Sequence, residues 1–550
     1  MSEIEKFIKN LNSLSLSKRM KEISKQMDYV SVFDTKGVQG LTGILNFKKT
    51  KDQVVFKVSF DIDFSLEHEF NVLNRINTIR TFCPHFVGTY GMSCLPISNK
   101  FISSHCQDSD DENEEEEDYE DENEDDTNEE DDEDCDCDEC NRKKMSLFDT
   151  DPNYLPSNIL FLDYISDISY YKVLKFGHKN IIHSQILMLM CALEISQQAI
   201  NFTHYDLHLD NILIKTCDEN LYHIYIIQNK KYLVPTNGFY PVLIDMGNSF
   251  VDTLNGKPIT STLMNYHNGL QPNVFDKLND VHHLLMSTFD YLEYKSPQWY
   301  SMCYRLMHEF RHVPIMRGKG WKKLPVDVSE ELMSYIKENI KETTILKDYE
   351  YNLLDIICYV VDLPIENCQE FNKNEFDDAL YSFLVEVGKL DIEDLVHNFE
   401  PLFIIKDLVM TINKNINNQN IKSVESQFKM NINFLITKAN YPKSFDFPKV
   451  FNAVKLIKKN LPYLLNKYIR DNNKFIKSKY DQLKIKSPID VFKILRQNLS
   501  QRYHFNEKTS FLVINADRQE QYPFSINKDY IPILNKMKLS DQEKYIFSKL

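Results

Sequence analysis

The chain has 550 residues, of which 42% are hydrophobic and 12% aromatic, and its formal net charge is −17. Its length corresponds to roughly two to four domains. The apolar content argues against a chain that is disordered throughout, and only 13 glycines argue against collagen-like chains and glycine-rich linkers.

The acidity is concentrated in one segment. Residues 108–139 hold 24 acidic residues and no Lys or Arg, so the rest of the chain carries a net charge of +7. Like charges at this density repel one another, and the segment has little apolar area to offset chain entropy. We therefore expect residues 106–145 to be a disordered acidic insert.

The first twenty residues contain no apolar signal-peptide core, and no run of about 18 apolar residues predicts a transmembrane helix. Eleven scattered Cys predict reduced thiols in a cytosol-like, non-secreted setting. Cys135, Cys137 and Cys140 can bind Zn²⁺ if His105 or Cys106 supplies a fourth ligand. Their position at the end of the acidic insert favours the alternative of reactive or idle thiols.

Residues 1–27 predict an amphipathic helical lead-in. Alternating apolar and polar positions then predict strands over 30–33, 43–47, 53–60 and 85–91, with a helix over 65–76. Beyond the acidic insert, residues 158–166 predict another strand. The first part of the chain is therefore expected to be rich in β-structure.

Residues 181–201 are apolar on every side, which predicts a helix inside a large lobe. Short strands are expected over 211–215, 222–228, 230–236 and 240–246, and the pattern is helical from about residue 280. A β-rich part followed by a helical part predicts an α+β fold with two lobes.

The strongest chemical signal is the run from His204 to Asn211, which lies between the apolar helix and a strand. Asp206 and Asn211 are five residues apart, so both side chains can converge on one point. A carboxylate there can accept a hydroxyl proton, and an amide oxygen can hold a metal ion on a phosphate.

A second signal is Asp245, which an apolar strand delivers into a turn that Gly247 permits. Mg²⁺ prefers one or two protein oxygens, with water and phosphate oxygens completing its octahedron. Asp245 is therefore a candidate Mg²⁺ ligand.

Two weaker signals lie nearer the N-terminus. Lys57 stands among apolar strand residues and needs a partner or a ligand phosphate, and Glu69 follows twelve residues later on the expected helix. A hairpin bearing Gly40 and Gly43 lies shortly before Lys57. Such a hairpin can bring backbone N–H groups onto phosphates.

In this order the four signals resemble the eukaryotic-type protein kinase superfamily, over roughly residues 28–310. The resemblance implies a bilobal protein-kinase-like fold, bound ATP and Mg²⁺, and phosphoryl transfer. The residues that match its nucleotide-binding positions are Gly40, Gly43, Lys57, Glu69, Leu162, Asp163 and Ile165, and Val38 replaces the first glycine of its nucleotide loop. Those that match its catalytic base, its metal ligands and the helix aspartate that braces its catalytic loop are Asp206, Asn211, Asp245 and Asp280.

Two details are similar to haspin and to the serine/threonine kinases inferred for giant DNA viruses. His208 stands where most protein kinases have Lys, and Asp206 and Asp245 are 39 residues apart, a longer separation than usual in the superfamily. The extra residues include Pro235-Thr236-Asn237-Gly238, similar to a Pro-Thr/Ser-x-Gly segment of those proteins. If the chain is viral, the expected cytosol-like setting is a host cytoplasm or a virion.

The chain also departs from the superfamily pattern. Tyr205 replaces the Arg that usually senses a phosphorylated activation loop, and no Ala-Pro-Glu follows Asp245. His208 also occurs in small-molecule phosphotransferases with an Asp-Leu-His-x-x-Asn loop. Three hypotheses follow: a Ser/Thr protein kinase, a small-molecule phosphotransferase of kinase-like fold, and a pseudokinase that serves as a scaffold.

The C-terminal region, residues 311–550, is expected to be helical and shows no catalytic motif. Within it, residues 441–500 carry 14 Lys and Arg against 4 Asp and Glu. A basic amphipathic helix can bind nucleic acid, a membrane surface or an acidic partner. The alternative is an ordinary solvated helical face.

Overall fold

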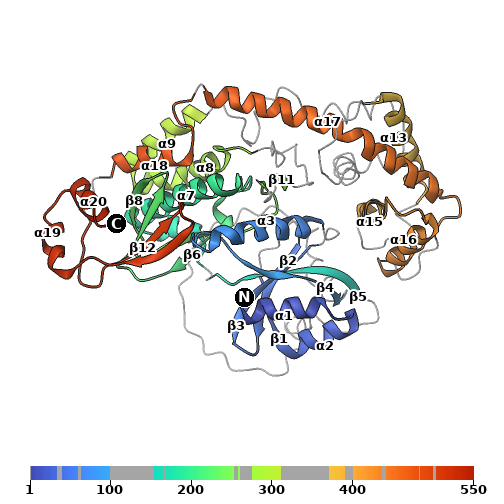
Figure 1. Ribbon diagram of the computed structural model, residues 1–550, viewed down its shortest axis with the longest axis horizontal. Coiled ribbons are helices and arrows are strands. Elements are labelled where there is room, and N and C mark those ends of the chain that lie inside the picture. The colour runs from blue at the N-terminus through green and yellow to red at the C-terminus, as the bar shows by residue number, and fades with distance from the viewer. Residues whose placement is uncertain are drawn as a thin grey trace, which may run out of the picture. The chain divides into compact units, whose positions relative to one another are not determined.

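The computed structural model describes residues 2–33, 40–59, 64–98, 154–165, 168–252, 258–259, 275–310, 371–390, 401–435, 441–481, 483–499 and 503–550 (Figure 1). The chain divides into two compact units. Unit 1 comprises Met1–Asp63, Tyr90–Tyr164 and Ile432–Lys438. Unit 2 comprises Phe64–Thr89, Ile165–Asn431 and Ala439–Leu550.

Unit 1 is built on a five-stranded sheet. In spatial order its strands are β1 (Met27–Val32), β2 (Gly40–Phe47), β3 (Asp52–Ser59), β5 (Tyr154–Asp163) and β4 (Thr89–Ser98). The pairs β1–β2, β2–β3 and β3–β5 are antiparallel. These strands overlap the segments that the sequence predicts, but the segment predicted at 85–91 shares only residues 89–91 with β4.

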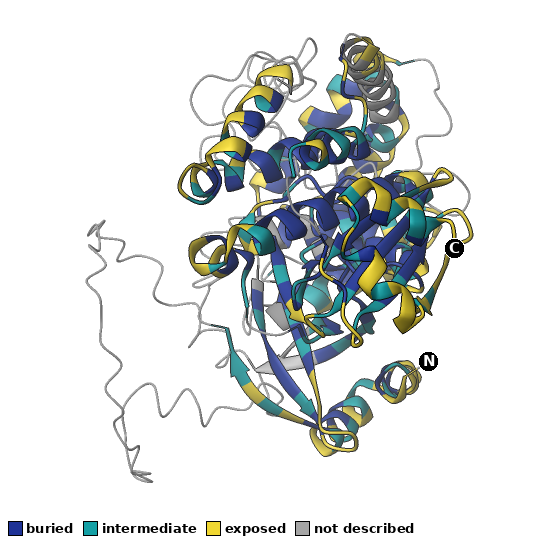
Figure 2. Ribbon diagram, turned by 90° about the vertical axis from the view of Figure 1, so that its left-hand side faces the viewer, coloured by how far each residue is buried: buried dark blue, intermediate teal, exposed yellow. Residues whose placement is uncertain are grey.

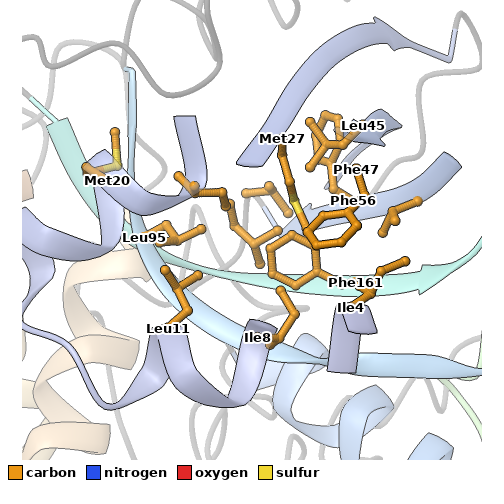
Figure 3. Packing of buried hydrophobic residues seen from close by; sticks show 14 of the residues in the cluster. Ile4, Ile8, Leu11, Met20, Met27, Leu45, Phe47, Phe56, Leu95 and Phe161 are labelled. Carbon is orange, nitrogen blue, oxygen red and sulfur yellow. The ribbon is translucent and has the colours of Figure 1, made fainter. Parts of the chain in front are cut away.

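The lead-in forms two helices, α1 (Glu3–Asn12) and α2 (Leu16–Gln26), each with one buried and one exposed side (Figure 2). A capping box between Ser2 and Glu5 begins α1. Ile4, Ile8 and Leu11 recur at helical spacing and pack into the apolar core of the sheet (Figure 3). The lead-in therefore belongs to the packed core of unit 1.

Unit 2 is centred on α7 (Lys179–Ile200), which is buried on all sides, as the sequence predicts. The helices around it in the sequence are α3 (Phe64–Arg80), α6 (Tyr170–Phe176), α8 (Asn279–Lys295) and α9 (Pro297–Phe310). Between α7 and α8 lie η1 (Leu209–Asn211), β6 (Ile212–Thr216), β7 (Leu221–Ile227), β8 (Lys230–Pro235), β9 (Phe239–Leu243), β10 (Val251–Asp252) and β11 (Pro258–Ile259).

The C-terminal region is not helical throughout, which corrects the expectation from the sequence. Its helices are α13 (Lys373–Gly388), α15 (Pro401–Lys414), α16 (Ile421–Leu435), α17 (Phe447–Asp481), α18 (Pro488–Gln497), α19 (Ile531–Leu534) and α20 (Leu539–Phe547), with the short η3 (Lys528–Tyr530). A hairpin of β12 (Ser510–Asn515) and β13 (Glu520–Phe524) lies among them.

This hairpin joins a four-stranded sheet in the order β13-β12-β7-β8, with β12 parallel to β7. Tyr222, Ile224 and Phe511 share one apolar cluster across the two segments. Pro523 is tolerated because β13 is an edge strand. The chain end thus completes a sheet that begins almost 300 residues earlier, and a pairing this distant leaves no local signal in the sequence.

Several basic residues of the 441–500 region have acidic partners. Lys449 contacts the buried carboxylate of Glu386 at 3.2 Å, and Lys459 contacts Glu375 at 3.1 Å. These ion pairs hold α17 against α13, which is consistent with a structural role for part of the positive charge. Binding of an acidic or nucleic-acid partner there stays a prediction.

Within the described residues, no helix combines the length and the apolar character needed to cross a membrane. The acidic insert and Cys135, Cys137 and Cys140 lie outside the described residues, so the predictions made for them stay predictions.

Candidate active site

The pairing of β6 with β9 brings two of the candidate residues together. The strands are antiparallel with Ile212 opposite Leu243, and the N–H of Ile244 donates to the carbonyl of Asn211 at 3.1 Å. Asn211 immediately precedes β6, and Asp245 follows shortly after β9. The start of one antiparallel strand and the end of its partner lie at the same edge, so both residues lie at that edge.

The long separation between Asp206 and Asp245 does not disturb this arrangement. The intervening residues form β7 and β8, which pair with each other and with β12. Thr236 Oγ1 donates to the carbonyl of Leu221 at 2.7 Å, and Asn237 Nδ2 donates to Ser184 Oγ on α7 at 2.8 Å. The Pro-Thr-Asn-Gly segment therefore fastens the base of this insertion to the core helix.

The loop that carries Asp206 is held by Asp280. The Asp280 carboxylate is fully buried and accepts the N–H of His204 at 2.7 Å and that of Tyr205 at 3.0 Å. Tyr205 has φ 65°, a left-handed conformation that is costly for a residue with a side chain. Burial raises the pKa of Asp280, while the charge of His204 and these hydrogen bonds oppose the rise. These two hydrogen bonds restrain the backbone of the loop immediately before Asp206.

Asp206 is the candidate base, and its side chain is 33% exposed. Asn248 Nδ2 donates to its Oδ2 at 3.2 Å, and His208 Nε2 lies 3.9 Å from its Oδ1. Its backbone carbonyl accepts the side-chain amide of Asn211 at 2.8 Å. The carboxylate is thus oriented by neighbours and still open to a substrate.

Asp245 and Asn211 supply the oxygen atoms that suit Mg²⁺. The amide nitrogen of Asn211 is engaged with Asp206 and lies 3.0 Å from His208 Nε2, which leaves its oxygen for a cation. Asp245 is half-buried at φ 56°, and its Oδ1 accepts the N–H of Gly247 at 3.3 Å. The described residues contain no cluster of three or more His, Cys, Asp or Glu that fits a metal. Two hard oxygens fit an ion that keeps water and phosphate as its other ligands.

Helix α3 contacts the segment that follows Asp245. The buried Glu69 accepts the N–H of Met246 at 3.3 Å, and His68 Nε2 donates to the carbonyl of Ser249 at 2.9 Å. Arg75 Nε donates to the carbonyl of Asp252 at 2.8 Å. Glu69 therefore contacts the residue that follows Asp245, the candidate Mg²⁺ ligand, within unit 2. Its pairing with Lys57 of unit 1 stays a prediction.

Lys57 lies in the middle of the sheet of unit 1, between Thr42 and Leu160. Val54, Phe56 and Val58 pack into the core under α1 and α2. Because side chains alternate along a strand, Lys57 points to the opposite face, where it is half-buried.

Close packing around Gly43 leaves no room for a side chain at this position. A Cβ at this position would lie 2.4 Å from the carbonyl oxygen of Ser31 and 2.6 Å from Phe56 Cε1. Gly40 begins β2, and Val38 lies outside the described residues. A phosphate contact of this hairpin stays a prediction.

The proposed hinge residues lie at the end of β5. Leu162 is buried opposite Val55, and Asp163 is half-buried opposite Val54. Ile165 is buried and is the first of its segment to belong to unit 2. Their contact with adenine stays a prediction.

Two residues near Asp206 were missed in the sequence. Asn248 lies three residues after Asp245, and only the fold brings it to Asp206. His283 of α8 is largely buried, which lowers its pKa to about 4, although the nearby charge of Asp206 opposes this. The sequence shows two adjacent histidines, His282 and His283, shortly after Asp280. Helical periodicity alone does not predict that His283 lies near Asp206.

Comparison with known proteins gives two viral relatives. No family model matches the chain. It is 22% identical over 528 residues to uncharacterized protein 098R of Invertebrate iridescent virus 6, covering 86% of this chain and 82% of that protein. It is 24% identical over 450 residues to uncharacterized protein 038R of Invertebrate iridescent virus 3, covering 73% and 75%.

Among solved structures, the crystal structure of the PF14_0431 kinase domain matches with a TM-score of 0.23 and 13% identity. The match covers 42% of this chain and 52% of that one.

Proposed function

We propose that the chain is a phosphotransferase that uses Mg²⁺ and ATP to phosphorylate Ser or Thr hydroxyls of proteins. The observation that carries this proposal is the convergence of Asn211 and Asp245 at one edge of the β6–β9 pair, beside a loop in which Asp280 fixes Asp206. A carboxylate base next to two oxygen ligands is the arrangement that phosphoryl transfer requires.

Asp206 orients the acceptor hydroxyl and takes its proton as the oxygen attacks phosphorus. Its exposure leaves room for the hydroxyl, and its contact with Asn248 limits rotation of the carboxylate. Phosphoryl transfer is accelerated mostly by positioning and by stabilisation of charge. A carboxylate that is fixed before the substrate arrives meets the first requirement.

Asp245 and the side-chain oxygen of Asn211 would hold Mg²⁺. When bound, the ion neutralises the developing charge on the phosphate oxygens. The Gly247 N–H orients the Asp245 carboxylate, so the ligand is in place without rearrangement. By the family resemblance, Lys57 would bind the α- and β-phosphates, Glu69 would support it, and Leu162, Asp163 and Ile165 would receive adenine.

The protein acceptor is the less supported half of the proposal. His208 and the lack of Ala-Pro-Glu also suit a small-molecule acceptor, and a scaffold would need no transfer at all. Retention of Lys57, Asp206, Asn211 and Asp245 favours an enzyme over a scaffold. The iridescent-virus relatives are consistent with action in an infected host cell.

The test is transfer of labelled γ-phosphate from Mg·ATP to the chain itself and to a panel of basic and acidic proteins. Asp206→Asn and Asp245→Asn are assayed beside it. Loss of a general base costs about 10²- to 10⁴-fold in rate, so Asp206→Asn should lose nearly all transfer. Asp245→Asn removes a charged ligand of the proposed Mg²⁺ and should also lose nearly all transfer. Asp218→Asn is the matched control, because Asp218 is an exposed aspartate in the turn before β7.

Label in protein that disappears in both variants and persists in the control supports the proposal. ATP binding without label in protein would move the assignment to a small-molecule acceptor. Absence of both transfer and nucleotide binding would refute the enzyme and leave the scaffold hypothesis.

A further inference from the structure

The turn that follows Asp245 also reaches the candidate base. Asn248 Nδ2 donates to Asp206 Oδ2 at 3.2 Å across 42 residues of sequence. Asn248 is half-buried, and the catalytic motifs of the sequence assign it no role. On the basis of the proposed function, we propose that Asn248 is a positioning residue that holds the Asp206 carboxylate in its reactive orientation.

The backbone around Asn248 is fixed from several sides. The N–H of Ser249 donates to the carbonyl of Met246 at 3.1 Å, which closes a four-residue turn with Asn248 inside it. Ser249 Oγ donates to the carbonyl of His204 at 3.2 Å, and Phe250 exchanges two backbone hydrogen bonds with Thr203. The turn is thereby attached to the loop that carries Asp206.

These contacts fix the backbone at Asn248, so its side-chain amide extends from a fixed point to Asp206 Oδ2. The two backbones are joined here by two short side chains, those of Asp206 and Asn248, which meet in this hydrogen bond. A catalytic group held by such a supporting contact loses little orientational entropy when substrate binds.

Asp245 directly precedes this turn, and its Oδ1 accepts the N–H of Gly247 at 3.3 Å. One short segment therefore carries the candidate metal ligand at its start and the support of the base three residues later. This sets the base and the metal ligand relative to each other, which phosphoryl transfer needs because attacking and leaving oxygens must lie in line.

A second side chain near the carboxylate, that of His208, lies farther away. His208 Nε2 is 3.9 Å from Asp206 Oδ1, beyond hydrogen-bond distance, and its side chain is 46% exposed. Removal of Asn248 would therefore leave the Asp206 carboxylate with greater freedom to rotate.

The test compares Asn248→Leu, which keeps the size and removes the amide donor, with Asn248→Gln, which keeps a donor on a longer arm. We expect Asn248→Leu to lower kcat about 10- to 100-fold, with the KM for ATP unchanged, and Asn248→Gln to recover part of the loss. Asn415→Leu is the control, since Asn415 is half-buried and donates to Thr411 O and Gln427 Oε1, away from the site.

A merely structural role would not separate kcat from KM in this way. An unchanged kcat in Asn248→Leu overturns the proposal. So does a higher KM for ATP with kcat intact, because that result makes Asn248 a nucleotide ligand. Equal losses in the Leu and Gln variants also count against it.

A second measurement is independent of activity. In a double-mutant cycle of Asn248→Leu with Asp206→Ala, which removes the acceptor oxygen, the effects on the unfolding equilibrium constant should be non-additive by about 3- to 10-fold. If the wild-type chain transfers no phosphate, the proposed function fails. The cycle then tests only the contact between Asn248 and Asp206. Non-additive effects of the two substitutions on stability support the contact, and additive effects overturn it.

Discussion

Replacing Asp280 by Asn tests the support of the catalytic loop. The two carboxylate oxygens accept the backbone N–H groups of His204 and Tyr205 at 2.7 and 3.0 Å. An Asn side chain keeps one acceptor, so its NH₂ group would face the second N–H in a site without solvent. A hydrogen bond to a charged group contributes about 1.5–3 kcal/mol, and a buried donor without a partner costs about 1–3 kcal/mol.

One term acts in the opposite direction. Burial raises the pKa of Asp280, so removing its charge relieves part of an electrostatic cost. We expect a net loss of about 2 kcal/mol in the free energy of unfolding, since these contributions partly offset each other. The left-handed Tyr205 backbone would lose its restraint at the same time, so phosphoryl transfer should fall further than stability alone explains.

The assay is urea unfolding of the chain, followed by tryptophan fluorescence, to which the buried Trp299 of unit 2 contributes, together with the rate of phosphoryl transfer. Asp290→Asn is the matched control, because Asp290 is exposed on the same helix and its substitution should change stability by less than about 0.5 kcal/mol. Equal stability of the Asp280 and Asp290 variants would refute the reasoning.

Three further predictions concern stability. Burial lowers the pKa of His85 to about 4. Below about pH 6.5 the unfolded state therefore binds a proton that the folded state does not bind, so the free energy of unfolding decreases as the pH falls from 6.5 towards 4. His85→Gln disturbs the hydrogen bonds of the ring with the Pro241 carbonyl and the Tyr225 hydroxyl, so it should be the less stable protein at pH 7.5. The difference in stability should narrow by about 2 kcal/mol at pH 5 in urea unfolding, because Gln does not titrate; a constant difference would contradict the assigned neutral state. Gly43→Ala should destabilise unit 1 by about 1–3 kcal/mol, because its Cβ would overlap Ser31 and Phe56; Asn46→Ala in the same strand is the control, and equal thermal midpoints would argue against the overlap. Truncation after residue 502 removes β12 and β13 from β7 and uncovers Tyr222 and Ile224, so the shortened chain should aggregate in gel filtration, and a folded monomer would disprove a structural role for the hairpin.

Local patterns were sufficient for most of unit 1 and for the core of unit 2. Alternation identified the strand around Lys57, and the all-round apolar run identified α7. Both features depend on residues close in sequence, whose periods of about two and 3.6 residues follow from backbone geometry.

Contacts between distant segments had no such signal. The β12–β13 hairpin pairs with a strand nearly 300 residues away, so its partner was not predictable from its own sequence. The same holds for Asn248, whose sequence neighbour is Asp245 but whose hydrogen-bond partner is Asp206.

By itself, the sequence determined which side chains are candidates for chemistry. The spacing of Asp206 and Asn211 and the turn at Asp245 led to the hypothesis of phosphate and metal chemistry, because carboxylate and amide oxygens are ligands that suit Mg²⁺. The tertiary structure decided how these groups are held. The β6–β9 register brings Asn211 and Asp245 to one edge, Asp280 fixes the loop of Asp206, and Asn248 orients its carboxylate. Orientation depends on hydrogen bonds between residues 42 to 76 positions apart, and such bonds exist only once the chain has folded.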